Sequence, residues 1–415
     1  MVEEFAGEGK GPEDGVRRNR TRSFLFMNGG IFVKPYRYPQ VKNIYFGDGV
    51  VKTLGTIVAT EGVNRVLVVT DKFLFENGML DNALKSLDEA KIEYKVYSDV
   101  HPNPLKSNVL ACYEMMKELK GEGVIGFGGG SSIDCAKSTA LLMTNPLPLE
   151  QYVGKDIVPN NTVPIFTVPT TAGTGSEVTS GSIILFDDTG KKGGILSKRL
   201  IATCAVVDPE LLLTLPPGLT AATGMDALAH AIEAYTNING SLQSDMWCRQ
   251  AITLIGKHLR RAYFKGDDLD ARRGMSLAAT SAGMALLGAG CAGSHAMAYS
   301  IENKYHTMHG RANASMLPAV MRFNAPAALE KYGEIAEMLG ENICGLSKHE
   351  AAYKASEAVQ KFCDDLGMPG IREYGVTEAD FEPFAQECCA NARLMGQNPR
   401  KITPEDAVKI YKEAY

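Results

Sequence analysis

The chain has 415 residues, 45% of them hydrophobic and 22% charged, and its 43 basic and 48 acidic side chains give a formal net charge of −5. This composition is typical of a folded globular protein and excludes a disordered chain, a collagen and a small disulfide-stapled domain. The mild acidity gives no electrostatic footprint for nucleic acid, and no stretch approaches the roughly 18 to 20 continuous apolar residues of a membrane span. We therefore expect a small soluble molecule as the partner, and neither nucleic acid nor a membrane.

Residues 1–40 are predicted to form an N-terminal extension. Its first part, to about residue 22, has little to bury, so we expect it to be mobile and its deletion to leave turnover unaltered. Arginines followed by an apolar run at 24–27 have the order of a signal peptide, but Asn28 and two glycines end the run early. The nine cysteines include no Cys-x-x-Cys pair, which is typical of a reducing compartment. These features predict a cytoplasmic protein.

Between residues 41 and 208, short β-branched runs alternate with amphipathic helical patterns. The helical patterns include 80–90 and 108–120. Strands and helices that alternate in this way predict a mainly parallel sheet covered by helices, and we expect 41–208 to be an α/β nucleotide-binding domain. The predicted strands cover residues 43–46, 65–70, 94–97, 124–127 and 164–168.

From about residue 219 the strand signal disappears and helix formers dominate. At about 150 residues per domain the chain length predicts two or three domains, and we expect two. Asp208-Pro209 and the run Pro216-Pro217-Gly218 mark the boundary, so 209–415 is predicted to be an all-helical domain. The predicted helices cover 219–235, 245–263, 271–287, 312–329 and 349–366.

Three glycines and two serines stand at one predicted strand-to-helix junction. The strand 124–127 leads into the segment 128–132 (Gly-Gly-Gly-Ser-Ser), and the sequence continues as a helix. Glycines let a phosphate approach the backbone, and a helix N-terminus offers unpaired N–H donors, so the junction favours an anion site. A tight turn without a ligand is the alternative. Neither the P-loop pattern nor G-x-G-x-x-G fits the segment.

Asp71 and a threonine-rich loop follow two other predicted strands. Asp71 stands where a carboxylate can accept from both ribose hydroxyls of NAD and repel the extra phosphate of NADP. Aspartate at a strand end also commonly caps the next helix, and taken alone the residue favours that interpretation. The loop 170–177 is small and rich in hydroxyls, which suits either a polar ligand or a structural turn.

Four side chains in the helical half have the chemistry of a metal site. Asp226 and His230 are four residues apart in a helical pattern, so they project from one face. His295 and His309 follow later, and His306, one turn before His309 in a helical stretch, is a candidate either for a substitute ligand or for a group that supports a ligand. Three neutral imidazoles and one carboxylate leave a divalent cation a net charge near +1, enough to polarise an alcohol or carbonyl oxygen. Ordinary polar histidines and a chance D-x-x-x-H pattern are the alternative.

Together the motifs resemble the iron-dependent (group III) alcohol dehydrogenase family, over about residues 41–415. Their joint, ordered occurrence makes the resemblance highly specific. The segments that carry it are 128–137 (GGGSSIDCAK), 169–179 (PTTAGTGSEVT), 222–235 (ATGMDALAHAIEAY) and 295–310, which begins at His295 and ends at His309-Gly310. The resemblance implies an N-terminal nucleotide-binding α/β domain, a C-terminal helical domain and an active site in the cleft between them.

The resemblance also implies roles for individual residues. The cofactor would be NAD, and Asp71 would select it by holding the adenosine ribose. The pyrophosphate would lie on Gly129, Gly130 and Ser131. The other cofactor contacts it implies are Asn103, Asp134, Thr170, Thr171, Thr174 and Lys192. The metal would be held by Asp226, His230, His295 and His309, with Fe²⁺ favoured by the family and Zn²⁺ or Mn²⁺ possible from the ligand types.

The activity implied is hydride transfer between NAD(H) and a short primary alcohol or aldehyde, with or without a further functional group, by a homodimer or larger homo-oligomer. A hydroxyacid-oxoacid transhydrogenase that retains its NAD is the alternative. A lyase with the related fold of dehydroquinate synthase and a metal-binding protein without catalysis are less favoured. The D-x-x-x-H pattern with two later histidines argues against the lyase, and the four occupied ligand positions argue against the loss of catalysis.

The chain departs from the family pattern near the third metal ligand. Many members have a further histidine four residues after it, where this chain has Tyr299. Tyr299 is a candidate hydrogen-bond donor to the substrate, with aromatic packing as the equal alternative. Arg311 follows the His309-Gly310 pair. It could recognise an anionic tail on the substrate, but an arginine in a surface or structural ion pair is the favoured interpretation.

Overall fold

The computed structural model describes residues 26–27, 30–31 and 36–415. Residues 1–35 and 36–415 form two separate units, and we describe each by itself. In the first, β1 (Phe26–Met27) pairs antiparallel with β2 (Gly30–Ile31). The predicted mobile segment 1–22 lies outside the described residues, so its mobility stays a prediction.

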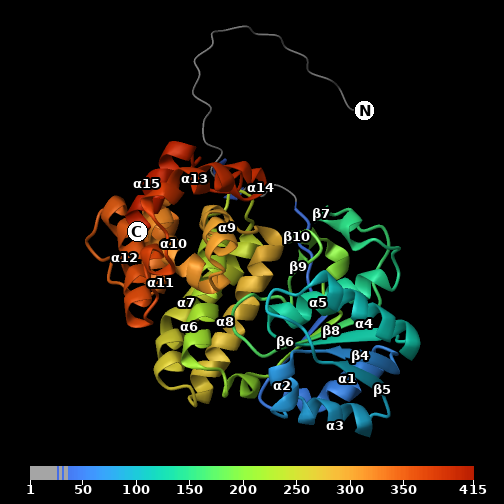
Figure 1. The fold of residues 1–415 in the computed structure, drawn as a ribbon. Helices are drawn as coiled ribbons and strands as arrows, with labels where there is room; N and C mark the ends of the chain where they lie inside the picture. Colours follow the sequence, from blue (N-terminus) through green and yellow to red (C-terminus); the bar gives the residue numbers. More distant parts are fainter. Residues whose placement is uncertain (1–25, 28–29, 32–35) are drawn as a thin grey trace, which may run out of the picture. The chain divides into compact units, whose positions relative to one another are not determined.

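The second unit is built around a six-stranded sheet in the order β3-β11-β8-β6-β4-β5 (Figure 1). Every pairing within it is parallel, as the alternation of strands and helices predicts. Five of the six strands are at the predicted places, and β11 was not predicted. The strands are β3 (Asn43–Phe46), β4 (Arg65–Val69), β5 (Glu93–Tyr97), β6 (Gly123–Gly128), β8 (Ile165–Pro169) and β11 (Cys204–Val207).

Helices cover both faces of this sheet, because successive strand residues point to opposite faces. On one face, Val66 and Val68 pack in a core that also contains Leu87 of α3. On the other, Leu67 and Val69 pack with residues of α4 and α5. Figure 1 shows α1 and α3 on one side of the sheet and α4 and α5 on the other. The helices of this region are α1 (Leu54–Thr60), α2 (Lys72–Glu76), α3 (Asp81–Glu89), α4 (Lys106–Leu119) and α5 (Gly130–Leu142).

A second, three-stranded sheet was not predicted. It has the order β7-β10-β9, where β9 (Gly181–Phe186) and β10 (Lys191–Leu196) form an antiparallel hairpin and β7 (Gly154–Lys155) pairs parallel with β10. The residues between the two hairpin strands end in Gly190, which is a turn signal. Ser182 of β9 contacts Ser138 of α5, so the hairpin is held beside the helix that follows the glycine segment.

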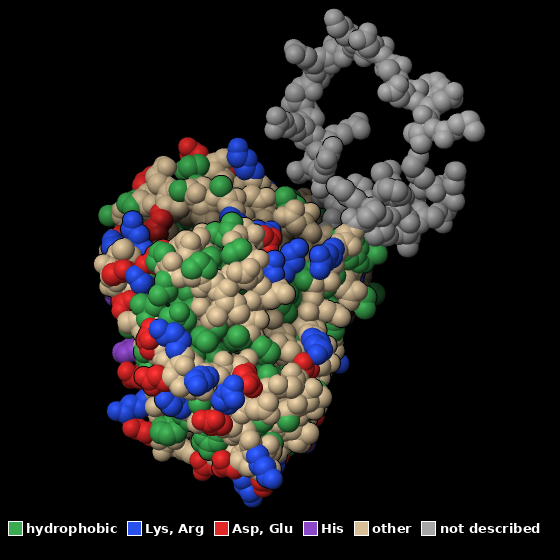
Figure 2. All heavy atoms as spheres, turned by 90° about the vertical axis from the view of Figure 1, so that its right-hand side faces the viewer, with side chains coloured by type: hydrophobic (Ala, Val, Ile, Leu, Met, Phe, Trp, Pro, Cys, Tyr) green, Lys and Arg blue, Asp and Glu red, His purple; other side chains and the backbone are tan. Residues whose placement is uncertain are grey.

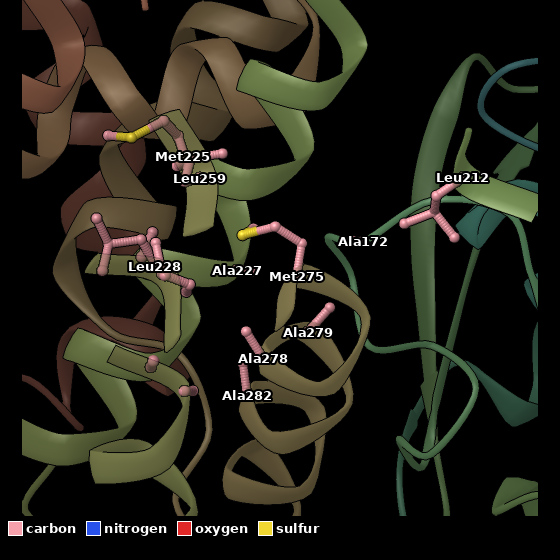
Figure 3. Close-up of a cluster of buried hydrophobic side chains, with 14 of the residues drawn as sticks. Ala172, Leu212, Met225, Ala227, Leu228, Leu259, Met275, Ala278, Ala279 and Ala282 are labelled. Atoms are coloured by element: carbon pink, nitrogen blue, oxygen red, sulfur yellow. The ribbon is translucent and has the colours of Figure 1, made fainter. Parts of the chain in front are cut away.

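The rest of the chain is helical, as predicted. α6, α7 and α8 share an apolar core with many alanines, of which Figure 3 shows part, including Met225, Leu259 and Met275. Small side chains at such contacts let helices approach closely. The helices are α6 (Pro217–Thr236), α7 (Leu242–Phe264), α8 (Leu269–Gly288), α9 (Gly293–Tyr305), α10 (His309–Asn324), α11 (Leu329–Met338), α12 (Lys348–Asp365), α13 (Phe381–Ala390), α14 (Ala392–Met395) and α15 (Pro404–Ala414).

The helix predicted over 312–329 is interrupted. α10 ends at Asn324, a 3-10 turn covers Ala325–Ala327, and α11 begins at Leu329. Pro326 lies in that turn and has no backbone N–H with which to continue the α-helical hydrogen bonds, and Ala328 leaves the helical conformation (φ −149°, ψ 47°). The break is the physical reason that the single predicted helix is wrong.

The surface charge and the helix lengths bear on the expectation that the protein binds neither nucleic acid nor a membrane. On the face drawn in Figure 2, basic and acidic side chains are interspersed. Within the described residues no single helix is long and apolar enough to cross a membrane, and α8 with α9 meets that test only as a pair bent by 107°.

Candidate metal and cofactor site

A cavity of about 650 Å³ is lined by residues of both the α/β region and the helical region. Of the predicted site residues, those that line it from the α/β region are Asn103, Gly130, Ser131, Asp134, Thr174 and Lys192. Those from the helical region are Asp226, His230, His295, Tyr299 and His309. Asp71, Gly129, Thr170 and Thr171 are not among the lining residues.

Three imidazoles converge on one carboxylate oxygen in this cavity. Asp226 Oδ1 lies 3.9 Å from His230 Nε2, 3.7 Å from His295 Nε2 and 3.5 Å from His309 Nε2. These separations are too long for hydrogen bonds, but four ligand atoms spaced in this way suit one cation, whose bonds to nitrogen and oxygen are about 2.0 to 2.2 Å. His295 Nε2 is buried without a hydrogen-bond partner, as expected for an atom that awaits a metal. The donor set therefore fits a divalent cation.

Helix geometry explains how these side chains meet. Asp226 and His230 lie one turn apart on the buried face of α6, as predicted. His295 lies in the first turn of α9, and His309 is the first residue of α10. His306 is wrong as a substitute ligand, because it ends α9 in a left-handed conformation (φ 53°) and is exposed.

Carboxylates outside the four-residue cluster orient two of the rings. His295 Nδ1 lies 2.5 Å from Glu233 Oε2, and Glu233 also accepts from the backbone N–H groups of Ala292 and Ser294. His309 Nδ1 lies 2.5 Å from Glu302 Oε1. A carboxylate on one ring nitrogen fixes the tautomer that leaves the other nitrogen free to bind a metal.

The charge balance of the cluster favours an ionised Asp226. Burial opposes ionisation, but the three imidazoles and a hydrogen bond from Asn313 Nδ2 outweigh it and lower the pKa of the Asp226 carboxyl. Asn313 Nδ2 also lies 3.1 Å from His309 Nε2.

The glycine segment begins a helix beside the cavity. α5 starts at Gly130, which lines the cavity together with Ser131. A Cβ on Gly130 would lie 3.0 Å from Thr174 Cγ2, so the loop after β8 closes directly over the helix start. Gly129 faces Thr171, whose Cγ2 would lie 3.5 Å from a Cβ there. The free N–H groups of this helix start have the chemistry that binds an anion.

Asp134 lies one turn further along α5. Its Oδ2 accepts from the backbone N–H of Ile183, and its Oδ1 is buried without a hydrogen-bond partner. Burial raises the pKa of Asp134 to about 6, opposed by Lys137. Burial also lowers the pKa of Lys137 to about 8, and the Lys137 ammonium donates to the carbonyls of Thr179 and Gly181. This buried cluster fixes the hairpin β9–β10 against α5.

Asp71 caps a helix. Its Oδ1 accepts from the backbone N–H of Leu74 at the start of α2, and Asp71 stands two residues after the end of β4. The cap predicted from the residue alone is therefore present, and the role in NAD selection stays a proposal.

Tyr299 and Arg311 differ in their placement. The Tyr299 ring stacks on His309 with centroids 5.7 Å apart, and burial raises the pKa of its hydroxyl well above the usual range. Arg311 is not among the residues that line the cavity, which favours its structural interpretation. The cationic side chains at the cavity are Lys155, Lys192 and Arg393.

Several residues at the site were missed in the sequence. Glu233 follows Asp226 by seven residues and His230 by three, which places it on the same helix face. Glu302 follows His295 by seven residues in α9. In both cases this helical spacing from a predicted metal ligand could have identified the glutamate as a residue of the site. Cys291 also lines the cavity, and no sequence pattern singles it out.

Comparison with known proteins identifies the family. Residues 41–209 match the model of "iron-containing alcohol dehydrogenase", and residues 220–415 match that of the "Fe-containing alcohol dehydrogenase family, C-terminal". The chain therefore belongs to the iron-containing alcohol dehydrogenase family.

Relatives of known name cover nearly the whole chain. A 1,3-propanediol dehydrogenase of Klebsiella pneumoniae is 38% identical over 92% of this chain and 98% of its own length. A NAD-dependent methanol dehydrogenase of Bacillus methanolicus is 36% identical over 89% and 97%. The crystal structure of a 1,3-propanediol oxidoreductase superposes with a TM-score of 0.90 at 37% identity, over 92% of this chain and all of that one. The crystal structure therefore has the fold described above for residues 36–415.

Proposed function

We propose that this protein is a metal-dependent, NAD-linked alcohol dehydrogenase or aldehyde reductase for a short primary alcohol or aldehyde. The observation that carries the proposal is the convergence of His230, His295 and His309 on Asp226 in a cavity that also contains the glycine start of α5. A metal site and an anion-binding helix start in one cavity are the two requirements of such a reaction. In this proposal, 41–208 is the cofactor domain and 209–415 the metal domain.

The two bound groups would supply the chemistry, and the protein would position them. A divalent cation, with Fe²⁺ favoured by the family, supplies positive charge beside the substrate oxygen, and NAD(H) accepts or donates the hydride. The backbone N–H groups of Gly129, Gly130 and Ser131 would hold the pyrophosphate. The remaining cofactor contacts would be Asn103, Asp134, Thr170, Thr171, Thr174 and Lys192.

Tyr299 is the side chain that we propose to contact the substrate oxygen. It lines the cavity beside His309, and its hydroxyl can donate a hydrogen bond. The alternative of a transhydrogenase with retained NAD would need exchange between a hydroxy acid and an oxo acid without added NAD. The names of the relatives, which act on propanediol and methanol, favour the dehydrogenase.

Removal of the metal is expected to abolish turnover reversibly. Dialysis against a chelator should leave a folded apoprotein that does not oxidise NADH with a short aldehyde, because nothing then polarises the carbonyl. Anaerobic addition of about one equivalent of Fe²⁺ should restore activity, and Zn²⁺ and Mn²⁺ serve as comparisons. Full turnover in a protein shown by elemental analysis to contain no metal would contradict the proposal.

Substitution at Asp71 is expected to change cofactor preference. In Asp71→Asn the side chain still caps α2 but has no charge to repel the 2′-phosphate, so the preference for NAD over NADP in kcat/KM should fall about ten-fold or more. Asp71→Ala removes the cap as well and should also lower stability by about 1 kcal/mol. An unchanged cofactor preference in both variants would make Asp71 a cap only.

The assembly and compartment are further parts of the proposal. We infer a cytoplasmic homodimer or larger homo-oligomer, and sedimentation of the purified protein tests the oligomeric state.

A further inference from the structure

Glu302 is a buried carboxylate that connects the two walls of the cavity. Only 3% of its side chain is exposed, and it lines the cavity from α9. Its Oε1 lies 2.5 Å from His309 Nδ1, and its Oε2 lies 3.5 Å from Nζ of Lys192 on β10. One carboxylate therefore contacts a residue of the metal cluster and a cation of the opposite wall.

Its place in α9 is set by the helix repeat. His295, Tyr299 and Glu302 are spaced by four and three residues, so they lie on one face of the helix. All three line the cavity. Glu302 thus projects from the same helix face as a metal-cluster histidine while it contacts another.

His309 depends on such a partner more than the other two rings do. The side chains of His230 and His295 are 7% and 1% exposed, whereas that of His309 is 33% exposed. Packing therefore restricts the His309 ring least, and His309 opens α10 three residues after the left-handed residue that ends α9. Tyr299 stacks on the ring and Asn313 lies near Nε2, but the hydrogen bond to Glu302 is the contact made at Nδ1, and it turns Nε2 toward Asp226.

We infer that Glu302 is a positioning residue that orients His309 for the metal, and that Lys192 balances its charge across the cavity. This inference rests on the proposed metal-dependent function. Removal of Glu302 should release the His309 ring and remove a negative charge near the cation, so metal binding should weaken. Removal of Lys192 should have the opposite electrostatic effect, because the Glu302 charge then acts on the cation without compensation.

The test is metal affinity measured without turnover. Co²⁺ is added to apoprotein, its visible absorption reports the geometry of its ligands, and competition with a chelator gives its Kd. Glu302→Ala is expected to raise the Kd about 10- to 100-fold and to change the spectrum. Glu302→Gln, which retains an acceptor oxygen but no charge, should lie between Glu302→Ala and the unsubstituted protein. Lys192→Met should bind Co²⁺ at least as tightly as the unsubstituted protein.

A control variant and the contradicting results distinguish failure of the inference about Glu302 from failure of the proposed metal-dependent function. Glu387→Ala removes an exposed carboxylate outside the cavity lining, together with the hydrogen bond that it accepts from Asn303, so it controls for the loss of a carboxylate that does not contact His309 and should not change the Kd. Circular dichroism and the Tm show whether each variant is folded. A folded Glu302→Ala with an unchanged Kd, or a Lys192→Met as weak as Glu302→Ala, would overturn the inference. If the unsubstituted protein binds no divalent metal, the proposed function itself fails.

Discussion

His295→Ala is expected to lose its metal and its activity while it retains its fold. His295 is 1% exposed, its Nδ1 is bonded to Glu233, and its Nε2 faces Asp226. The substitution removes one of three imidazoles from the cluster, and with it the several kcal/mol that a bound cation contributes to catalysis. We expect kcat/KM to fall at least about 10²- to 10³-fold. Elemental analysis after desalting and NADH oxidation with a short aldehyde measure the two effects.

The fold should survive because Glu233 retains other partners. Its carboxylate still accepts from the N–H groups of Ala292 and Ser294. His349→Ala is the matched control, since His349 is exposed and its ring contacts Tyr353. This control should retain full metal and full turnover. Undiminished metal content and turnover in His295→Ala would remove His295 from the site.

Gly175→Ala is expected to destabilise the protein by about 2 to 5 kcal/mol. Gly175 has φ +63°, and a Cβ there would lie 2.5 Å from Gly283 Cα and 2.9 Å from Gly283 N. The left-handed conformation costs alanine about 1 to 2 kcal/mol, and overpacking costs about 1 to 3 kcal/mol more. The contact joins the loop after β8 to α8, so the loop residues that line the cavity should shift and the KM for NAD should rise. Denaturant unfolding and steady-state kinetics measure the two effects.

Gly190→Ala separates the two costs. Gly190 has a similar φ of +69°, but nothing lies within 4 Å of a Cβ there. It should lose only the backbone contribution, about 1 to 2 kcal/mol, with an unchanged KM. Equal losses of stability in Gly175→Ala and Gly190→Ala would show that the close approach to α8 has no energetic weight.

The parallel sheet could be predicted from local patterns, and the hairpin β9–β10 could not. Buried strands such as β4 and β6 are largely apolar runs, and such runs can be recognised as strands in the sequence. β10 begins Lys191-Lys192-Gly193-Gly194, residues with low strand propensity. It forms a strand because it pairs with β9, whose Ser182 contacts α5. Such tertiary support leaves no trace in local sequence.

Part of the candidate site could likewise be predicted from local sequence patterns, and part could not. Asp226 and His230 could be paired from their spacing, because both lie on α6. The approach of His309 to Asp226 depends on the close packing of α10 against α6, which no local pattern encodes. His306 was considered as a substitute ligand because a continuous helix would place it one turn before His309. The structure differs because α9 ends at His306. Glu302 has a helical spacing from His295, but only the fold shows that it contacts His309 and Lys192.

The most direct test of the proposed function follows the hydride itself. Anaerobically purified protein loaded with Fe²⁺ is incubated with NADH in which both C4 hydrogens of the nicotinamide are replaced by deuterium and with a panel of short aldehydes, including hydroxy-, carboxy- and sulfo-substituted ones. We predict that mass spectrometry finds one deuterium at the carbinol carbon of at least one product alcohol, and none after chelation. If no aldehyde yields deuterated alcohol although the protein binds both metal and NADH, the proposed function is contradicted.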